Sequence, residues 1–259
     1  VGEFTDLQGV MGMRYARVGG EPEAVATAIN EQYMPRGASD DTPETPTGQC
    51  VAIADKIDTL VGIFAIGQKP TGEKDPYALR RAALGILRTL IERGLDIDLH
   101  ALIDTAAAAL ADKVDARAAR QEVFAFMLDR LKAYYQDRDV SADVFDAVSA
   151  LQPGRPLDFD RRIRAVQAFR KLPEAESLAA ANKRVGNILK KAEDTTGTDV
   201  DTALFSEPAE QALHQQLASL KQDVEPLFER GDYENALCRL SVLREPVDAY
   251  FDNVMVMAD

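Results

Sequence analysis

The spacing of apolar residues along this chain is that of amphipathic helices almost throughout. Apolar positions return every three or four residues, and alternating runs of β-branched residues bounded by turn residues are nearly absent. The pattern therefore predicts an all-α protein, a multi-helix bundle array. The expected helices cover residues 7–16, 21–33, 49–64, 76–93, 99–111, 116–135, 141–150, 159–171, 174–192, 207–230, 233–243 and 247 to the end.

Proline, glycine and small polar residues mark where the helices are interrupted. The stretch 35–48 holds three prolines and two glycines and predicts a loop, as do 67–74 and 152–156. Residues 193–201 have the composition of a polar linker. The helix 49–64 is almost wholly apolar on one side, which predicts a central place in a bundle.

Composition restricts the kind of protein further. The chain has 259 residues, 46% hydrophobic and 28% charged, which is typical of one or two globular domains. Its two cysteines, Cys50 and Cys238, offer neither a zinc-binding spacing nor a disulfide framework, and we expect them to be small buried apolar residues. A reducing, cytoplasmic location is the expectation, with no membrane partner, because no apolar run approaches about 20 residues.

Charge is distributed unevenly along the chain. The net charge of -13 argues, for the chain as a whole, against a polyanionic partner such as nucleic acid. Residues 155–191, however, hold ten basic and four acidic residues, a net charge of +6. The flanking segments 1–154 and 192–259 carry -8 and -11. The chain is acidic with one basic zone.

The helix expected at 174–192 gives this zone a defined face. At 100° per residue, its apolar residues gather on one side, while Lys183, Asn187 and Lys190 fall together on the other. Arg184 and Lys191 flank them, and Asn182 is adjacent. Cations and amides on one ridge suit phosphates and base edges, although an ordinary solvated helix face has the same pattern.

Motifs for catalysis or metal binding are weak. Residues 67–74 superficially resemble a phosphate-binding loop, but Glu73 stands where a lysine is needed and no strand precedes it. Asp55 and Asp58, three residues apart, favour a structural role over a shared metal. Neither His100 nor His214 has a partner pattern, and both are expected at a surface or interface. We therefore expect no catalytic residue and no metal ligand in this chain.

Six long segments, taken in order, resemble one known family. They are similar to the β subunit of the bacterial two-subunit glycyl-tRNA synthetase and cover residues 1–12, 30–36, 52–64, 74–83, 179–189 and 244–257. The resemblance implies an α2β2 glycine–tRNA ligase. In that enzyme the α subunit would use ATP and Mg for the chemistry, and the β subunit would bind and select tRNA(Gly). This chain alone would be non-catalytic and would bind no cofactor.

The resemblance also implies a division into three parts. Residues 1–95 would be the C-terminal part of an HD-like helical domain, 96–150 a helical connector, and 151–259 an anticodon-binding helical domain of the DALR type that lacks its last segment. Asp55 would stand for the last aspartate of an HD pattern, but no His-Asp pair exists in the chain. This departure puts a metal-dependent activity in doubt.

The expected partners are tRNA(Gly) and the α subunit, with no DNA. The expected RNA-binding residues lie mainly in the basic zone, with Arg130 as a weaker addition; they are Arg161, Arg164, Lys171, Asn182, Lys183, Arg184, Asn187, Lys190, Lys191 and Arg130. Two alternatives remain at this point. One is an HD-type metal-dependent phosphohydrolase, and the other is a helical scaffold that docks a partner subunit.

Overall fold

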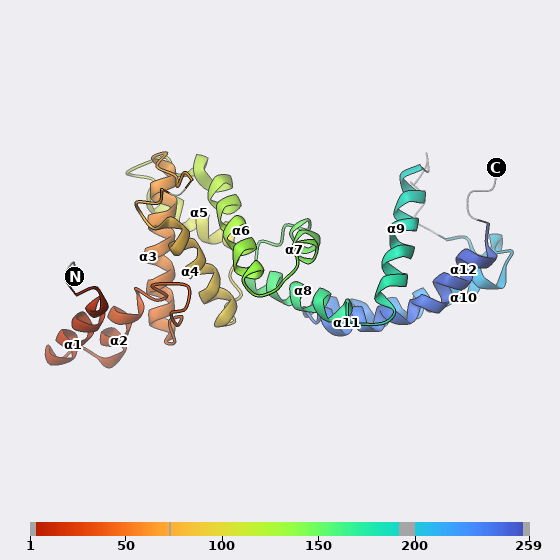
Figure 1. The fold of residues 1–259 in the computed structure, drawn as a ribbon, viewed down its shortest axis with the longest axis horizontal. Helices are drawn as coiled ribbons and strands as arrows, with labels where there is room; N and C mark the ends of the chain where they lie inside the picture. Colours follow the sequence, from red (N-terminus) through yellow and green to blue (C-terminus); the bar gives the residue numbers. More distant parts are fainter. Residues whose placement is uncertain (1–3, 73, 192–199, 256–259) are drawn as a thin grey trace. The chain divides into compact units, whose positions relative to one another are not determined.

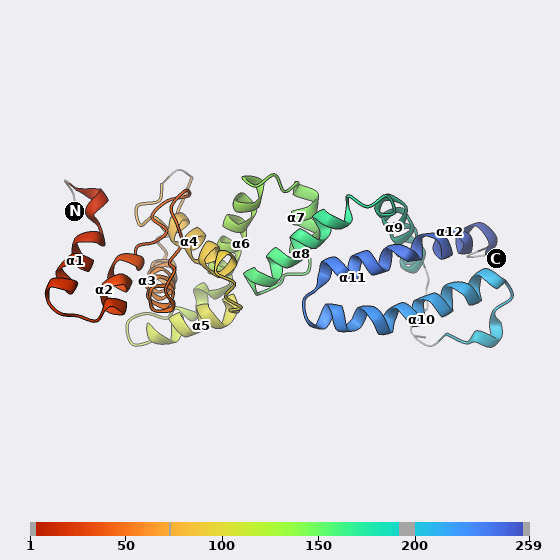
Figure 2. The same cartoon turned by 90° about the horizontal axis from the view of Figure 1, so that it is seen from below.

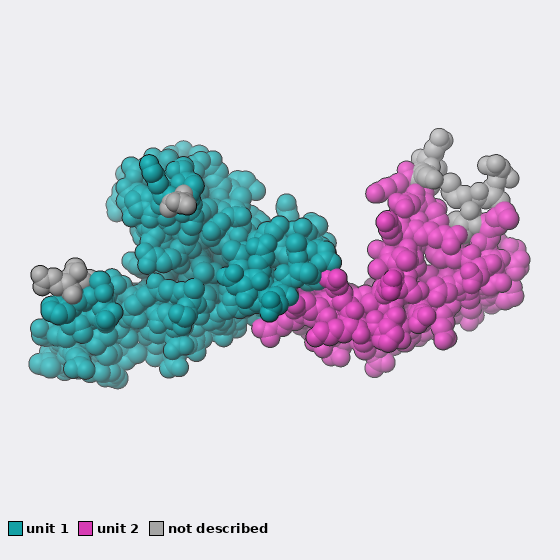
Figure 3. Space-filling view, in the orientation of Figure 1, with its two compact units in different colours: residues 1–160 teal, residues 161–259 magenta. Residues whose placement is uncertain are grey.

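The computed structural model of the chain describes residues 4–72, 74–191 and 200–255. It divides into two compact units, residues 1–160 (unit 1) and residues 161–259 (unit 2), which Figure 3 shows in different colours. Within the described residues the regular elements are helices, with no β-strand. The all-α prediction is confirmed, whereas the division into three parts at 95 and 150 stays a prediction.

Unit 1 is organised around one long helix, α3 (Figure 1). This helix packs against α2, α4, α5 and α6, so the prediction that it is central to a bundle is confirmed. The core includes Leu60 of α3, Ile86 and Leu90 of α4, and Met127 of α6, all fully buried. The helices of the unit are η1 (Thr5–Leu7), α1 (Val10–Val18), α2 (Glu23–Glu31), α3 (Pro46–Ala65), α4 (Leu79–Glu92), α5 (Leu99–Ala109), η2 (Arg117–Ala119), α6 (Arg120–Gln136), α7 (Ala142–Ser149) and the start of α8 (Pro156–Phe169).

Helix α3 begins three residues earlier than predicted, at Pro46. The side chain of Thr45 accepts the N–H of Gly48 at 3.1 Å, and proline fits the first helical position because its missing N–H has no partner there. Glu31, at the end of α2, is buried and accepts the N–H groups of Glu44 and Thr45 at 2.9 and 3.2 Å. A carboxylate from one helix thus holds the chain that enters the next.

The loop that precedes α3 is fixed to α4 by two arginines. Arg88 is buried, forms an ion pair with Glu92, and donates to the carbonyl oxygens of Ala38 and Asp40, both at 2.9 Å. Arg93 donates to the hydroxyl of Thr42 at 2.9 Å. Loop carbonyl groups lack the hydrogen bonds that carbonyl groups within a helix have, and the two arginines supply donors for them. This explains how a loop rich in proline lies against the core.

The start predicted for α4, at residue 76, is three residues too early. The helix begins at Leu79, after Ala78 in a left-handed conformation with φ 55°. The Asp75 carboxylate still accepts the N–H groups of Leu79 and Arg80, at 2.8 and 3.0 Å. Asp75 therefore caps the helix from outside its first turn.

Unit 2 has a smaller core. Helix α10 lies alongside α11 and α12, which follow each other along it (Figure 2). Leu220, Val224, Leu227 and Ala236 form the buried cluster. The helices of unit 2, after the remainder of α8, are α9 (Ala175–Lys191), η3 (Thr202–Leu204), α10 (Pro208–Glu229), α11 (Tyr233–Leu240), η4 (Ser241–Leu243) and α12 (Arg244–Asn253). The last helix begins three residues before its predicted start, and most of the predicted linker 193–201 lies outside the described residues.

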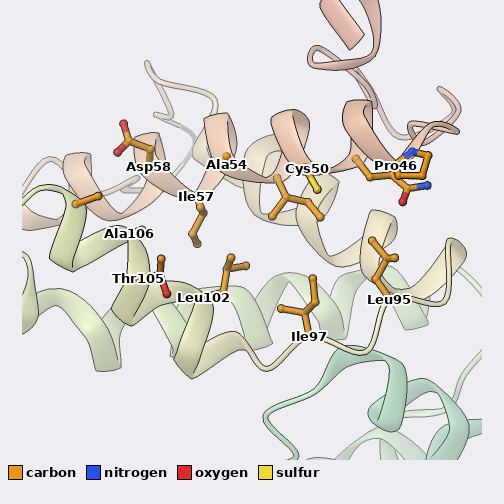
Figure 4. Close-up of a pocket in the computed structure, with 13 residues that line it drawn as sticks. Pro46, Cys50, Ala54, Ile57, Asp58, Leu95, Ile97, Leu102, Thr105 and Ala106 are labelled. Carbon is orange, nitrogen blue, oxygen red and sulfur yellow. The ribbon is translucent and has the colours of Figure 1, made fainter. Parts of the chain in front are cut away.

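Both cysteines contradict the prediction that they are buried, because Cys50 and Cys238 are exposed. Cys50 lies on α3 and lines an apolar groove of about 660 Å³ between α3 and α5, together with Ile53, Ile57 and Leu102 (Figure 4). The apolar side of α3 is therefore covered only in part by its neighbours. In the part of the chain that is described, no helix combines the length and apolarity that crossing a bilayer requires.

Candidate nucleic-acid interface

Helix α9 packs against α12 within unit 2. The hydroxyl of Ser177 donates to the carboxylate of Asp248 on α12, at 3.2 and 3.3 Å to its two oxygens. About two turns later, the guanidinium of Arg184 lies over the ring of Phe251, with its Cζ 4.0 Å from the ring centroid. These two contacts fix which side of α9 faces α12.

The polar side of α9 is open to solvent. Asn182, Lys183, Asn187 and Lys190 are all exposed, as predicted for one ridge of a helix. Within the described residues their side chains have no hydrogen bond or ion pair. We call Lys183, Asn187 and Lys190 the α9 ridge. Its two ammonium groups, which no described carboxylate pairs with, can bind an anionic ligand.

Arg184 has a different environment from the ridge. Its guanidinium rests on Phe251, an arrangement that contributes roughly 0.5–1 kcal/mol at an exposed site. A change at Arg184 therefore disturbs the packing of α9 on α12 as well as the local charge. Arg184 is less suitable than Lys183 or Lys190 for testing a contact with a ligand.

The apolar side of α9 is only partly covered. Leu178, Ala181 and Ile188 are half-buried, whereas Val185 is 40% and Leu189 56% exposed. The C-terminal end of α9 extends away from α12 (Figure 1). Asn187 and Lys190 of the ridge therefore share the projecting half of α9 with this open apolar strip.

The predicted cations of α8 are placed differently from the ridge. Arg161 lies beside the turn between α10 and α11, where its Nη1 is 3.1 Å from the position a Cβ at Gly231 would take. Arg164 is exposed but already has an interaction partner, and Lys171 is exposed just after the helix ends. The sequence prediction missed Arg162, whose guanidinium donates to the hydroxyl of Tyr233 at 2.7 Å and joins α8 to α11.

Arg130 and Lys191 complete the set of predicted RNA-binding residues. Arg130 belongs to unit 1, where it pairs with Asp129 and lies 5.8 Å from the ring centroid of Phe126. The side chain of Lys191 is outside the described part of the chain. Their proposed contacts with RNA stay predictions.

The other candidate metal-binding or catalytic side chains of unit 1 and unit 2 do not form a common site within either unit. Asp58 lines the apolar groove, whereas Asp55 lines a different, polar pocket of unit 1, so these two carboxylates do not form one site (Figure 4). His100 stacks on Phe124 with ring centroids 4.1 Å apart, and His214 packs edge-on against Phe205. In the described ranges no three histidine, cysteine, aspartate or glutamate side chains are grouped to hold a metal ion.

Comparison with known proteins identifies the chain's relatives. Residues 1–150 match the family model described as glycyl-tRNA synthetase beta subunit. The chain belongs to this family. Residues 178–259 match a second family model, the DALR anticodon binding domain. Every residue of the α9 ridge lies in this second stretch, whereas Arg161, Arg164 and Lys171 fall between the two matched stretches.

Individual members of the family are similar over the whole chain. The glycine–tRNA ligase beta subunit of Pseudomonas aeruginosa (strain LESB58) is 57% identical over all 259 residues. Those of Vibrio campbellii and Pasteurella multocida are 54% and 53% identical over 257 residues, or 99% of the chain. The chain spans about 38% of the length of the Pseudomonas relative and 37% of the other two.

Proposed function

We propose that this chain is the tRNA-binding part of a glycine–tRNA ligase β subunit and that unit 2 binds the anticodon arm of tRNA(Gly). One observation carries the proposal. The α9 ridge presents two ammonium groups, which have no ion-pair partner among the described residues, and an amide, all exposed, in the stretch that matches an anticodon-binding domain. Although the net charge of the chain is -13, the lysines of the ridge are exposed where a polyanion can reach them.

The ridge suits the two tasks that anticodon recognition requires. Lys183 and Lys190 lie about two turns apart on one side of α9 and would contact successive phosphates of the arm. Asn182 and Asn187 carry both donors and acceptors and would read base edges in the unstacked loop, where RNA sequence is mostly recognised. The acidic remainder of the chain repels RNA elsewhere and so favours this orientation.

The rest of the reaction belongs to the complete enzyme. We infer that the α subunit of an α2β2 assembly supplies the glycine, ATP and Mg chemistry and that this chain chooses the tRNA. Family membership supports this division of labour, and so does the character of the ridge, which offers charge and hydrogen bonds but no nucleophile or general base. A cytoplasmic location stays a prediction.

The two alternatives have weaker support. The phosphohydrolase hypothesis requires Asp55 as a metal ligand. Three cations line the same pocket as this carboxylate, and their charge repels a metal ion. The scaffold hypothesis is compatible with the apolar groove on α3, but the groove gives no indication of its occupant.

Salt dependence tests the proposed contact with phosphate. Replacing Lys190 with glutamine should reduce the slope of log K against log salt by about 0.8, because one fewer counterion is released on binding. The measurement is the affinity of the chain for tRNA(Gly) by fluorescence anisotropy between about 50 and 200 mM KCl. Over this range an affinity that depends on phosphate contacts falls steeply with salt.

The control is Lys221→Gln. Lys221 is exposed on α10 of the same unit but lies 3.6 Å from the carboxylate of Glu225. The slope of log K against log salt for the Lys221→Gln variant should equal that of the wild-type chain. If the Lys190 variant behaves like this control, Lys190 does not touch a phosphate and the proposed contact is wrong.

A further inference from the structure

A polar pocket in unit 1 brings together residues from four separate stretches of the chain. Its volume is about 350 Å³, and it is lined by the loop after α2, by α3 and by the start of α4. Three of the lining residues are cations, one is an acid and two are tyrosines: Arg36, Lys56, Arg81, Asp55, Tyr33 and Tyr77. The charged side chains of the lining sum to +2, in a part of the chain that is otherwise acidic.

Lys56, on α3, is half-buried in the lining of this pocket. Its ammonium donates to the carbonyl oxygens of Gln32 and Met34, both at 2.9 Å, and of Ala52 at 3.4 Å, and forms no ion pair with a carboxylate among the described residues. Gly85 leaves room for its stem, since a Cβ there would lie 3.1 Å from the Lys56 Cε. The charge of Lys56 is therefore held in place by neutral carbonyl groups, and no carboxylate among the described residues hydrogen-bonds to it.

Burial lowers the pKa of Lys56 to about 8, although Asp55 partly opposes the shift and Arg36 adds to it. A charged ammonium in this pocket is thus destabilised in the absence of a ligand. An anion beside it would restore the charged form.

The other two cations complete the arrangement. The guanidinium of Arg36 is oriented by the carbonyl oxygen of Gln8 at 3.1 Å and the side-chain oxygen of Asn30 at 2.9 Å, and its other terminal nitrogen forms an ion pair with Asp40 at 3.4 Å. Arg81 is exposed at the mouth, and within the described residues its side chain has no hydrogen bond or ion pair. A divalent metal ion is repelled by such a lining, whereas a phosphate is attracted.

We propose that this pocket binds the phosphate of a single nucleotide, with Arg36, Lys56 and Arg81 around the phosphate and Tyr33 or Tyr77 against the base. Arginine forks and an ammonium are the groups that recognise phosphate, and tyrosine rings provide a face on which a base stacks. The site lies in unit 1 and is independent of the proposed role of the α9 ridge. The nucleotide is either free or part of an RNA strand.

Calorimetric titration of the chain with AMP, inorganic phosphate and adenosine tests the site. AMP should bind at least tenfold more tightly than adenosine, because the three cations act on its phosphate. Arg81→Gln should weaken AMP about tenfold, while Arg117→Gln, the same change at an exposed arginine outside the pocket, should have no effect. Equal binding of AMP and adenosine, or equal behaviour of the two variants, overturns the proposal.

Raising the pH gives a second readout from the same titration. Lys56 loses its proton as the pH rises through about 8, whereas the second phosphate pKa near 6 keeps AMP doubly charged. The affinity for AMP should therefore fall several-fold between pH 7.5 and pH 9.5, and a constant or rising affinity contradicts the role of Lys56.

A 5′-phosphorylated RNA trinucleotide distinguishes the source of the nucleotide. Tighter binding than AMP, lost in Arg81→Gln, identifies an RNA strand as the ligand. Weaker binding than AMP identifies the free nucleotide.

Discussion

Reversing both ridge charges, with Lys183→Glu and Lys190→Glu in one chain, should weaken the binding of tRNA(Gly) at least a hundredfold. Each lysine would lose a charge-assisted contact with phosphate, a loss of roughly 1.5–3 kcal/mol, and each glutamate would add repulsion. Two lost contacts thus exceed the 2.7 kcal/mol or so that corresponds to a hundredfold change. The measurement is the equilibrium affinity at about 0.1 M salt, where the Debye length near 10 Å leaves local charges only partly screened.

The choice of residues separates this experiment from a change in fold. Lys183 and Lys190 are exposed and have no partner among the described residues, so their replacement leaves the Arg184–Phe251 contact intact. The matched control is Lys113→Glu with Arg117→Glu, two exposed cations of unit 1, which changes the net charge by the same amount. Equal loss of affinity in both double variants would show that only the total charge matters, and the ridge assignment would fail.

A second large effect is expected at the junction of α2 and α3. Gly48→Ala should lower the free energy of unfolding by about 3 kcal/mol, because the new Cβ would lie 2.6 Å from the Cβ and 2.8 Å from the Cδ of Glu31. The side chain of Glu31 accepts hydrogen bonds from the N–H groups of Glu44 and Thr45. It cannot move aside without breaking these bonds. Urea unfolding followed by circular dichroism measures the change.

Two variants check that the cause is the close approach to Glu31. Gly186→Ala, in α9, meets no atom within 4 Å and should stabilise the helix by up to about 1 kcal/mol. In a Glu31→Ala background, Gly48→Ala should cost much less than in the wild-type chain. A full loss of stability in that background would place the origin of the effect elsewhere.

Helix periodicity predicted the architecture because packing follows it closely in this chain. The central place of α3 could be read from its apolar side, since a helix with such a face must be covered by others. The helix starts were less accurate because they depend on contacts distant in sequence. Pro46 begins α3 with the help of Glu31, from the end of α2, and no local pattern shows that bond.

The α9 ridge could also be predicted, because a single helix carries all of it and 100° spacing is sufficient to align its residues. The polar pocket of unit 1 could not. Arg36, Lys56 and Arg81 lie on a loop and two helices, and only the packing of α3 against α4 brings them to one cavity. For the same reason, the sequence did not show that Asp55 and Asp58 line different cavities or that Arg184 is held by Phe251.

A footprint of the chain on tRNA(Gly) tests the central claim most directly. Hydroxyl-radical cleavage of the end-labelled tRNA, with and without the chain, reports which riboses the protein covers. Protection should lie in the anticodon stem and loop and should disappear with the Lys183→Glu and Lys190→Glu double variant. Protection confined to the acceptor stem, or protection of the anticodon arm that survives in this variant, would contradict the assignment of the α9 ridge.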